Sequence, residues 1–491
     1  MANKIIGRVN EQRELKDIFI SSRSEFVAIY GRRRIGKTYL IHNFFVNRKC
    51  IYLHAQGSQT GDIREQLENF TNALSETFFN NEPIKVAESW KEAFERLTRA
   101  MENSSGNKKN KIVLFFDELP WMATPKSGLL DALDYYWNRT WSNMPNLKLI
   151  ICGSSASWII KKIIYSKGGL HNRVTKEINL NSFSLYETKE YLQNMGCEYN
   201  DEQILEIYMA IGGVPYYLNS IKKHLSAMQN INKLCFSGTD LFVEFDNLFS
   251  SLFKEPDSYI EIIRVIADTR YGISRPDIEK KCKLSKKGGS LSDKLKALQD
   301  AGFILSFKPL MNDTRELFYK VIDEYSLFYM QWIEPEKDSL LKMEKNSNFW
   351  KSKYKTPAWY AWAGYSFEAV SYKHLNIIRK VLNIPAGSRA STWKYIPKNS
   401  SENGAQIDLL FDREDKSYTI CEIKYTEKQY VIDKDYSKQL RNKEDVFVSI
   451  TKTKKQIFLT MVAANGVKEN AYYDVLNGVV TSRDFFDPKY I

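Results

Sequence analysis

The chain has 491 residues, too many for one ordinary core, and its 43% hydrophobic content suffices for several domains. The 71 basic residues exceed the 59 acidic ones, and the net charge of +12 favours an anionic partner such as nucleic acid, although a diffuse excess also serves solubility alone. Six scattered cysteines form no CxxC pair or Cys/His cluster, which excludes a zinc site of that kind and is typical of a reducing compartment. No signal-peptide pattern and no apolar run of the ~18 residues needed to cross a bilayer is present, so we expect a soluble, cytoplasmic protein.

A glycine-rich stretch near the N-terminus has the pattern of a phosphate-binding loop. Residues 31–38 read Gly-Arg-Arg-Arg-Ile-Gly-Lys-Thr and lie between a β-rich run, residues 25–30, and a helical run, residues 38–46. A strand before the loop and a helix after it are the context that such a loop requires. The expected nucleotide-binding residues are Gly31, Arg32, Arg33, Arg34, Ile35, Gly36, Lys37 and Thr38.

The glycines, the lysine and the threonine of this loop each have a role in binding a nucleotide. Gly31 and Gly36 permit backbone conformations that a β-carbon would block, so that the loop N–H groups can face the phosphates of ATP. Lys37 is expected to neutralise the β- and γ-phosphates, and Thr38 is expected to place its hydroxyl on Mg²⁺.

Residues 111–118 read Lys-Ile-Val-Leu-Phe-Phe-Asp-Glu, an apolar run that ends in two carboxylates. A continuous apolar run is typical of a buried parallel strand, and ligands bind at the carboxyl ends of such strands. Asp117 is therefore expected to hold Mg²⁺ through water, and Glu118 to polarise the attacking water. The alternative is a core strand that ends in two solvated acids.

Two further features follow along the chain. A strand at residues 147–152 precedes Ser154 and Ser155, either of which could sense the γ-phosphate, although an ordinary turn has the same composition. Arg173 stands just before another strand, residues 176–180. It could act as an arginine finger on a neighbouring subunit's γ-phosphate, or stay in its own sheet as a salt-bridge partner.

These motifs, in this order, resemble the AAA+ module of the archaeal-type, STAND-related ATPases. The matching residues are Ile6-Gly7-Arg8 with Glu11, Tyr30 to Thr38, Phe116-Asp117-Glu118, Cys152-Gly153-Ser154-Ser155, Arg173 and Ile211-Gly212-Gly213-Val214-Pro215. The resemblance implies an ATPase core over residues 1–182 and a helical lid over residues 183–255. It also implies that Gly7, Arg8 and Pro215 lie on the adenine side of the nucleotide.

Residues 256–330 resemble a winged helix-turn-helix. We expect helices at 259–268, 275–282 and 290–301, followed by paired strands at 303–307 and 317–322. Nine Lys or Arg against four Asp or Glu between residues 270 and 300 make this window strongly basic. Contact with DNA phosphates is expected from Lys286, Lys287, Lys294 and Lys296. The alternative to DNA binding is that this winged helix serves only as a scaffold for packing or oligomer assembly. The aromatic-rich residues 331–362 are expected to form a helical linker.

Residues 363–491 are expected to begin with a helix over 364–382 and to continue with strands at 405–411 and 417–424. Asp408 and Glu422 on paired strands would make a site for Mg²⁺ or Mn²⁺, and Lys424 could stabilise a phosphate in the transition state. With Glu368 upstream, this arrangement resembles the PD-(D/E)xK nuclease fold. The resemblance implies a catalytic role for Glu368, Asp408, Glu422 and Lys424, whereas an amphipathic hairpin produces the same spacing without a metal site.

The sequence thus predicts an α/β multidomain protein with a P-loop AAA+ parallel sheet, a helical lid, a winged helix and a PD-(D/E)xK-like C-terminal domain. The predicted function is ATP binding and hydrolysis in a protein that acts on DNA, with a tail that is a metal-dependent nuclease. The alternative is a nucleotide-controlled oligomeric switch whose tail only binds nucleic acid or protein. The expected cofactors are ATP and Mg²⁺, and the expected partners are DNA and further copies of the chain.

Overall fold

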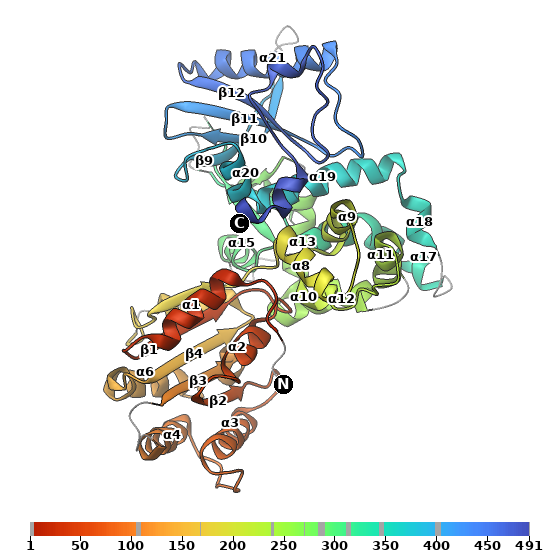
Figure 1. The fold of residues 1–491 in the computed structure, drawn as a ribbon. Helices are drawn as coiled ribbons and strands as arrows, with labels where there is room; N and C mark the ends of the chain where they lie inside the picture. The colour runs from red at the N-terminus through yellow and green to blue at the C-terminus, as the bar shows by residue number, and fades with distance from the viewer. Residues whose placement is uncertain are drawn as a thin grey trace. The chain divides into compact units, whose positions relative to one another are not determined.

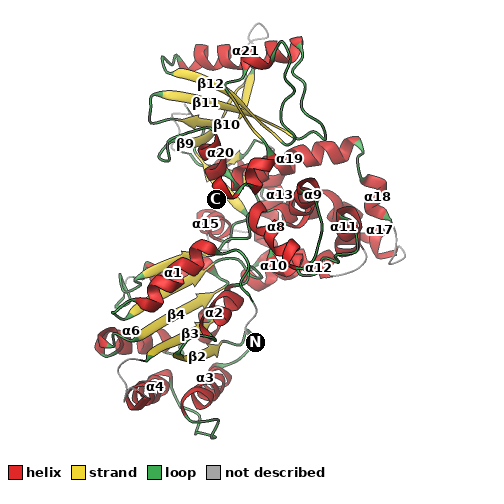
Figure 2. Ribbon diagram, viewed as in Figure 1, coloured by secondary structure: helices red, strands yellow, loops and turns green. Residues whose placement is uncertain are grey.

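A computed structural model describes residues 4–104, 110–166, 168–236, 240–269, 271–282, 290–310, 316–342, 348–397 and 404–490. The chain divides into two compact units, Met1–Ser182 and Phe183–Ile491 (Figure 1). Helices, strands and loops alternate along the first unit, and three separate sheets are present among the described residues of the chain (Figure 2). None of the helices in the described ranges is long and apolar enough to span a membrane.

The first unit is built on a five-stranded parallel sheet with the order β2-β3-β4-β1-β5. Its strands are β1 (Glu25–Tyr30), β2 (Cys50–Gln56), β3 (Lys111–Asp117), β4 (Leu147–Gly153) and β5 (Lys176–Asn179). Its helices are α1 (Val9–Ile20), α2 (Lys37–Phe45), α3 (Ile63–Phe78), α4 (Trp90–Ser104), α5 (Leu119–Met122), α6 (Leu129–Arg139) and α7 (Ala156–Ile159), with short segments η1 (Trp141–Asn143) and η2 (Ile160–Ile164).

Helices cover both faces of this sheet. Alternate residues of β3 point to opposite sides: Ile112, Leu114 and Phe116 pack in the core under α3, α4 and α6. Val113 and Phe115 pack in the core under α1 and α2. Strands buried on both faces read as unbroken apolar runs, which is why the sequence of β3 shows no polar alternation. The result is a doubly covered α/β sheet, and five-stranded parallel sheets of this kind are typical of P-loop AAA+ ATPases.

The second unit begins with helices. They are α8 (Leu185–Asn194), α9 (Asp201–Ile211), α10 (Pro215–Leu218), α11 (Ala227–Phe236) and α12 (Asp240–Leu252). Ser184 and Asn200 are the N-cap residues of α8 and α9, and each forms a capping box. Their side chains accept hydrogen bonds from the otherwise free N–H groups of Glu187 and Gln203, which fixes where the two helices begin.

Three helices and a small antiparallel sheet come next. The elements are α13 (Pro256–Ala267), β6 (Ile273–Ser274), α14 (Arg275–Lys281), α15 (Leu291–Asp300), β7 (Ile304–Phe307) and β8 (Phe318–Val321), with the sheet order β6-β8-β7. Ser274 and Ser290 accept hydrogen bonds from the N–H groups of Asp277 and Asp293 and thereby cap α14 and α15. We refer to residues 256–321 as the middle module.

Short helices connect the middle module to the tail. They are α16 (Glu324–Phe328), η3 (Tyr329–Ile333), η4 (Glu334–Glu336), α17 (Lys337–Lys342) and α18 (Phe349–Lys353). The aromatic side chains here pack against one another: Trp350 is 1% exposed, and its ring lies 5.3 Å from Trp332 and 5.9 Å from Trp362. These aromatic side chains belong to the buried core of the second unit.

The tail combines helices with a five-stranded mixed sheet of order β13-β12-β11-β10-β9. Its elements are α19 (Pro357–Lys373), α20 (Leu375–Val381), β9 (Arg389–Tyr395), β10 (Ala405–Asp412), β11 (Ser417–Lys424), α21 (Lys434–Thr451), β12 (Gln456–Ala463), η5 (Tyr473–Val475), β13 (Gly478–Val480), η6 (Ser482–Phe486) and η7 (Pro488–Tyr490). Strands β9 to β11 are antiparallel, and β11 to β13 are parallel. Helix α19 begins at Pro357 rather than at the expected Gly364, because Thr356 caps it by accepting from Trp359 N–H.

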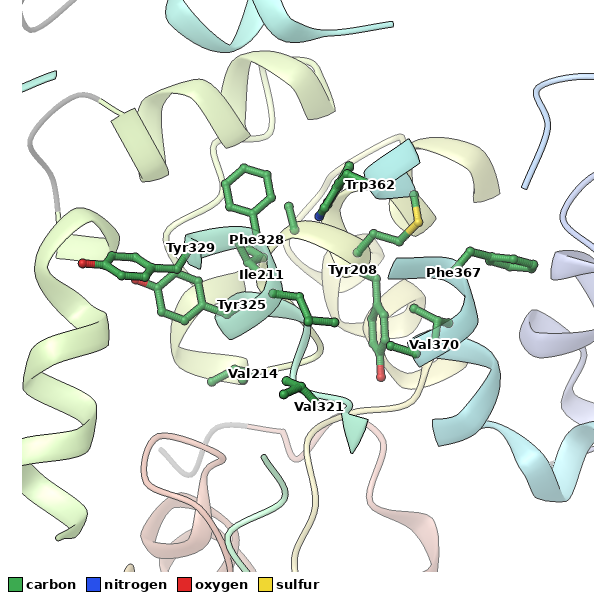
Figure 3. Close-up of a cluster of buried hydrophobic side chains, with 14 of the residues drawn as sticks. Tyr208, Ile211, Val214, Val321, Tyr325, Phe328, Tyr329, Trp362, Phe367 and Val370 are labelled. Atoms are coloured by element: carbon green, nitrogen blue, oxygen red, sulfur yellow. The ribbon is translucent and has the colours of Figure 1, made fainter. Parts of the chain in front are cut away.

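One apolar core runs through the second unit. Tyr208 of α9, Val321 of β8, Phe328 of α16 and Phe367 of α19 belong to the same buried cluster (Figure 3). The helices after residue 182, the middle module and the tail therefore share buried surface.

Candidate functional site

The loop between β1 and α2 has the backbone that phosphate binding needs. Gly31 has φ of 143°, and a Cβ there would lie 2.1 Å from the carbonyl oxygen of Leu180. Gly36 has φ of 87° and stands at the N-cap of α2. Lys37 is 5% exposed, and its Nζ donates to the carbonyl oxygens of Gly31 at 2.9 Å and Arg32 at 2.8 Å. The loop itself thus holds the ammonium group that is expected to meet the phosphates.

Thr38 and Asp117, the two expected Mg²⁺ ligands, are in direct contact. The Thr38 hydroxyl donates to Asp117 Oδ2 at 2.7 Å, and the Glu118 N–H donates to Asp117 Oδ1 at 3.0 Å. Burial alone would raise the pKa of Asp117, but the nearby His54 ring and the hydrogen bond from Thr38 outweigh it and lower the pKa. Asp117 is therefore an anion, and a hydroxyl beside a buried anion is a donor set that fits Mg²⁺.

Glu118 follows β3 in a left-handed conformation, with φ of 49°. One of its carboxylate oxygens, Oε2, accepts from Ser154 N–H at 2.9 Å and from Ser154 Oγ at 3.0 Å. Because β4 is the neighbour of β3 in the sheet, the residue after β4 reaches the residue after β3. The structure thus brings together Thr38, Asp117, Glu118 and Ser154.

His54 is a member of this site that the sequence patterns missed. It lies on β2, its Nε2 is 3.5 Å from Asp117 Oδ2, and its ring stacks on Phe115 at 4.7 Å. No motif surrounds it. The available signal was its position near the end of a strand that pairs with β3.

The remaining expected residues of the ATP site lie in different settings. Arg8 is buried, and its guanidinium donates to the carbonyl oxygen of Ile35 at 3.0 Å, which ties the N-terminal segment to the phosphate loop. Gly7, like Arg8, has a left-handed backbone, with φ of 61°. Arg173 is exposed in the turn before β5. Pro215 stands at the first turn of α10 in the second unit.

A second set of charged residues lies in the tail, on β10 and β11. Strand pairing places Leu409 opposite Cys421, and Asp408 Oδ2 accepts from the Ile423 N–H at 3.1 Å. Burial, together with Glu422 and Glu368 nearby, raises the pKa of Asp408 to about 7. The three expected carboxylates are thus close enough to act on one another.

Lysines hold two of these carboxylates. Glu422 accepts from Lys424 Nζ at 2.8 Å, from Tyr436 OH at 3.1 Å and from Lys443 Nζ at 2.5 Å. Burial would raise the pKa of Glu422, but Lys443 and Lys424 lower it. Glu368 of α19 accepts from Lys320 Nζ.

Helix α21 contributes two side chains to the site, Tyr436 and Lys443. They are seven positions apart and therefore lie on one face of the helix. The chemistry of Asp408 and Glu422 suits a hard cation, although no group of three His, Cys, Asp or Glu side chains arranged to hold a metal occurs among the described residues.

The prediction that Lys294 contacts DNA is wrong. Its side chain is buried, and its Nζ donates to Ser258 Oγ at 2.8 Å and to Glu255 Oε2 at 3.2 Å. Lys296 is exposed, with its Nζ 3.6 Å from Asp300. Lys286 and Lys287 lie outside the described residues.

Comparison with known proteins finds a related family for the N-terminal part. Residues 6–221 match the family described as an ATPase domain predominantly from Archaea. Over these residues the chain is similar to that ATPase domain. An uncharacterized protein of Methanocaldococcus jannaschii is 26% identical over 444 residues, which cover 89% of this chain and 90% of that protein.

Solved structures show weaker likeness. The Walker-type ATPase of Pyrococcus abyssi is 18% identical with a TM-score of 0.45, and the match covers 66% of this chain and 95% of that one. The ORC2 protein of Aeropyrum pernix, solved in ADPNP and ADP complexes, is 14% identical with a TM-score of 0.41, covering 72% of this chain and 98% of that one.

Proposed function

We propose that this protein binds ATP with Mg²⁺ at the loop of residues 31–38 and hydrolyses it. The observation that carries the proposal is the continuous set of contacts from Thr38 through Asp117 and Glu118 to Ser154. Mg²⁺, when bound with the nucleotide, neutralises charge that develops on the phosphates.

Residues of the chain bind the phosphates, hold the cation and orient the attacking water. Lys37 exchanges the carbonyl oxygens of its loop for phosphate oxygens, and Thr38 and Asp117 hold the cation. Glu118 orients the attacking water. Arg173, exposed before β5, acts on the nucleotide of a neighbouring copy, and Gly7 and Arg8 contribute to the adenine side.

We further propose that the protein acts on DNA through the middle module. Three helices followed by a β-ribbon are the element order of a winged helix, and Lys296 on α15 is exposed. This window also carries much of the basic excess of the chain.

The tail is proposed to be a PD-(D/E)xK-like domain in which Asp408 and Glu422 bind a divalent cation and Lys424 stabilises the scissile phosphate. The adjacency of the carboxylates on paired strands supports it. One observation favours the alternative of a switch with a non-catalytic tail: Glu422 and Glu368 already have lysine partners.

Incubation of the full chain with plasmid, single-stranded DNA and RNA, with and without ATP, Mg²⁺ and Mn²⁺, separates the two functions. Cleavage that needs a divalent cation and disappears in Asp408→Ala supports the nuclease. ATP turnover with nucleotide-dependent oligomer size and no cleavage of any substrate supports the switch.

A further inference from the structure

Lys320 belongs to the middle module by sequence, yet its side chain lies among residues of the tail. It stands on β8 opposite Leu305 of β7, and it is 1% exposed. Its Nζ donates to Glu368 Oε1 on α19. The next residue, Val321, is fully buried in the apolar core, so the backbone of β8 is held in place at this point.

Two tyrosine rings of α19 complete the surroundings of the ammonium group. Its Nζ lies 4.8 Å from the ring centroid of Tyr372 and 5.7 Å from that of Tyr365. Tyr372 OH in turn donates to the backbone oxygen of Asp408. The ammonium of Lys320 is therefore connected to the same strand that carries the expected cation ligand Asp408.

The charges at this place balance without a metal. Asp408, Glu422 and Glu368 supply three carboxyl groups, and Lys320, Lys424 and Lys443 supply three ammonium groups. Lys424 and Lys443 both bind Glu422, which leaves Lys320 as the cation that contacts Glu368 among the described residues. A buried carboxylate needs such a partner, and a lysine ammonium can fill that need as a divalent cation would.

A cavity of about 290 Å³ reaches the carboxyl groups. Glu368 and Asp408 line it together with Tyr271 and Phe318 of the middle module and Gln406 of β10. A small cation can therefore approach Asp408 and Glu368, where it meets the ammonium of Lys320.

We propose that Lys320 is the resident cation of this carboxylate site, and that a divalent cation binds only when the ammonium leaves Glu368. The inference rests on the proposed cation site of the tail and adds the residue that controls its affinity. The middle module thereby sets the metal affinity of the tail.

The test measures Mn²⁺ binding to the nucleotide-free full chain by calorimetry and by the shift of the melting temperature. Lys320→Gln removes the charge and keeps a hydrogen-bond donor for Glu368. This variant should bind Mn²⁺ at least about tenfold more tightly than the wild type, because a close charge pair changes a binding affinity by that order. Lys320→Arg keeps the charge and should stay at the wild-type affinity, and adding Asp408→Asn to Lys320→Gln should abolish the gain.

A matched control separates competition for the site from general loosening. Lys373 of α19 is half-buried and forms another ion pair, with its Nζ 2.5 Å from Oε2 of the buried Glu324 on α16. Lys373→Gln weakens packing against the same helix and should leave Mn²⁺ affinity unchanged. Equal gains in Lys320→Gln and Lys373→Gln, or equal affinity of Lys320→Gln and wild type, would overturn the role of Lys320 while the cation site stands. Absence of Mn²⁺ binding in all variants would overturn the cation site as well.

Discussion

Ser154 donates two hydrogen bonds to one carboxylate oxygen of Glu118, one from its N–H at 2.9 Å and one from its hydroxyl at 3.0 Å. The pair joins the ends of two neighbouring strands and fixes the carboxylate that is proposed to orient water. Ser154 was one of two serines that the sequence offered as a phosphate sensor, and the structure gives it a definite partner.

Ser154→Ala should lower kcat for ATP hydrolysis about tenfold and leave ATP affinity unchanged, because one charge-assisted hydrogen bond to Glu118 is lost. Ser155→Ala is the matched control, since the Ser155 side chain makes no cap hydrogen bond at the start of α7. Steady-state hydrolysis and binding of a fluorescent nucleotide measure the two quantities. Equal kcat in both variants would contradict a role for Ser154 in ATP hydrolysis.

Lys37→Ala should weaken ATP binding by about 10- to 100-fold, because the loop then faces the phosphates without its cation. Glu118→Gln should instead keep ATP binding and stop hydrolysis, since an amide cannot accept a proton from water. Equilibrium binding and phosphate release distinguish these outcomes. Unchanged ATP affinity in Lys37→Ala would contradict the assignment of residues 31–38 as the ATP-binding loop.

Lys296→Glu should weaken DNA binding and reduce the slope of log affinity against log salt concentration by about one, because one phosphate contact is lost. Lys294→Glu should instead lower the melting temperature, since its side chain is buried beside Glu255. Fluorescence anisotropy across a salt series and thermal unfolding measure the two effects. Wild-type DNA affinity in a folded Lys296→Glu variant would favour the scaffold role.

Asp408→Asn and Glu422→Gln should change stability in opposite directions without any divalent cation. Asp408 lies half-buried beside two other carboxylates, so its neutralisation should be neutral or stabilising by about 1 kcal/mol. Glu422→Gln leaves Lys424 and Lys443 without their buried partner and should cost about 3 to 5 kcal/mol. Urea unfolding of the full chain measures both. The same sign for both variants would contradict the charge balance described here.

Glu206 should make stability depend on pH. Burial raises its pKa to about 7, although the hydroxyl of Tyr354 donates to it at 2.6 Å. Since the folded pKa exceeds the ordinary value of 4.5, the folded state keeps the proton longer than the unfolded state. The contribution of Glu206 to the free energy of unfolding is fully present below pH 4.5 and is lost as the pH rises through 7.

Glu206→Gln keeps an acceptor for Tyr354 and should remove this pH dependence, with a gain at pH 8 of up to about 3 kcal/mol. Glu198→Gln, exposed before α9, is the control and should change the profile little. Denaturant unfolding between pH 4 and 8 provides the measurement. A wild-type profile in Glu206→Gln would refute the assignment.

The sequence predicted well those features that depend on neighbours in the chain. The phosphate loop, strand β3 and the strand pair around Asp408 and Glu422 all have local patterns of glycine, apolar runs or turn residues. Strands β9, β12 and β13 of the same five-stranded sheet were not predicted, because none of them carries a chemical motif such as the one around Asp408.

Residues that reach a site from distant elements could not be predicted in this way. Lys320 stands 48 positions from Glu368, and only the packing of β8 against α19 brings them together. Lys294 is different, because the signal was present. It falls between Leu291, Leu295 and Leu298 in the helical repeat, on the face that turns toward the core.

The apolar core that connects α9, β8, α16 and α19 makes the helices after Ser182, the middle module and the tail neighbours within one compact unit. Elements that share a buried core tend to open and close together. Within the second unit, a rearrangement that starts in the helices after Ser182 would carry the middle module and the tail with it.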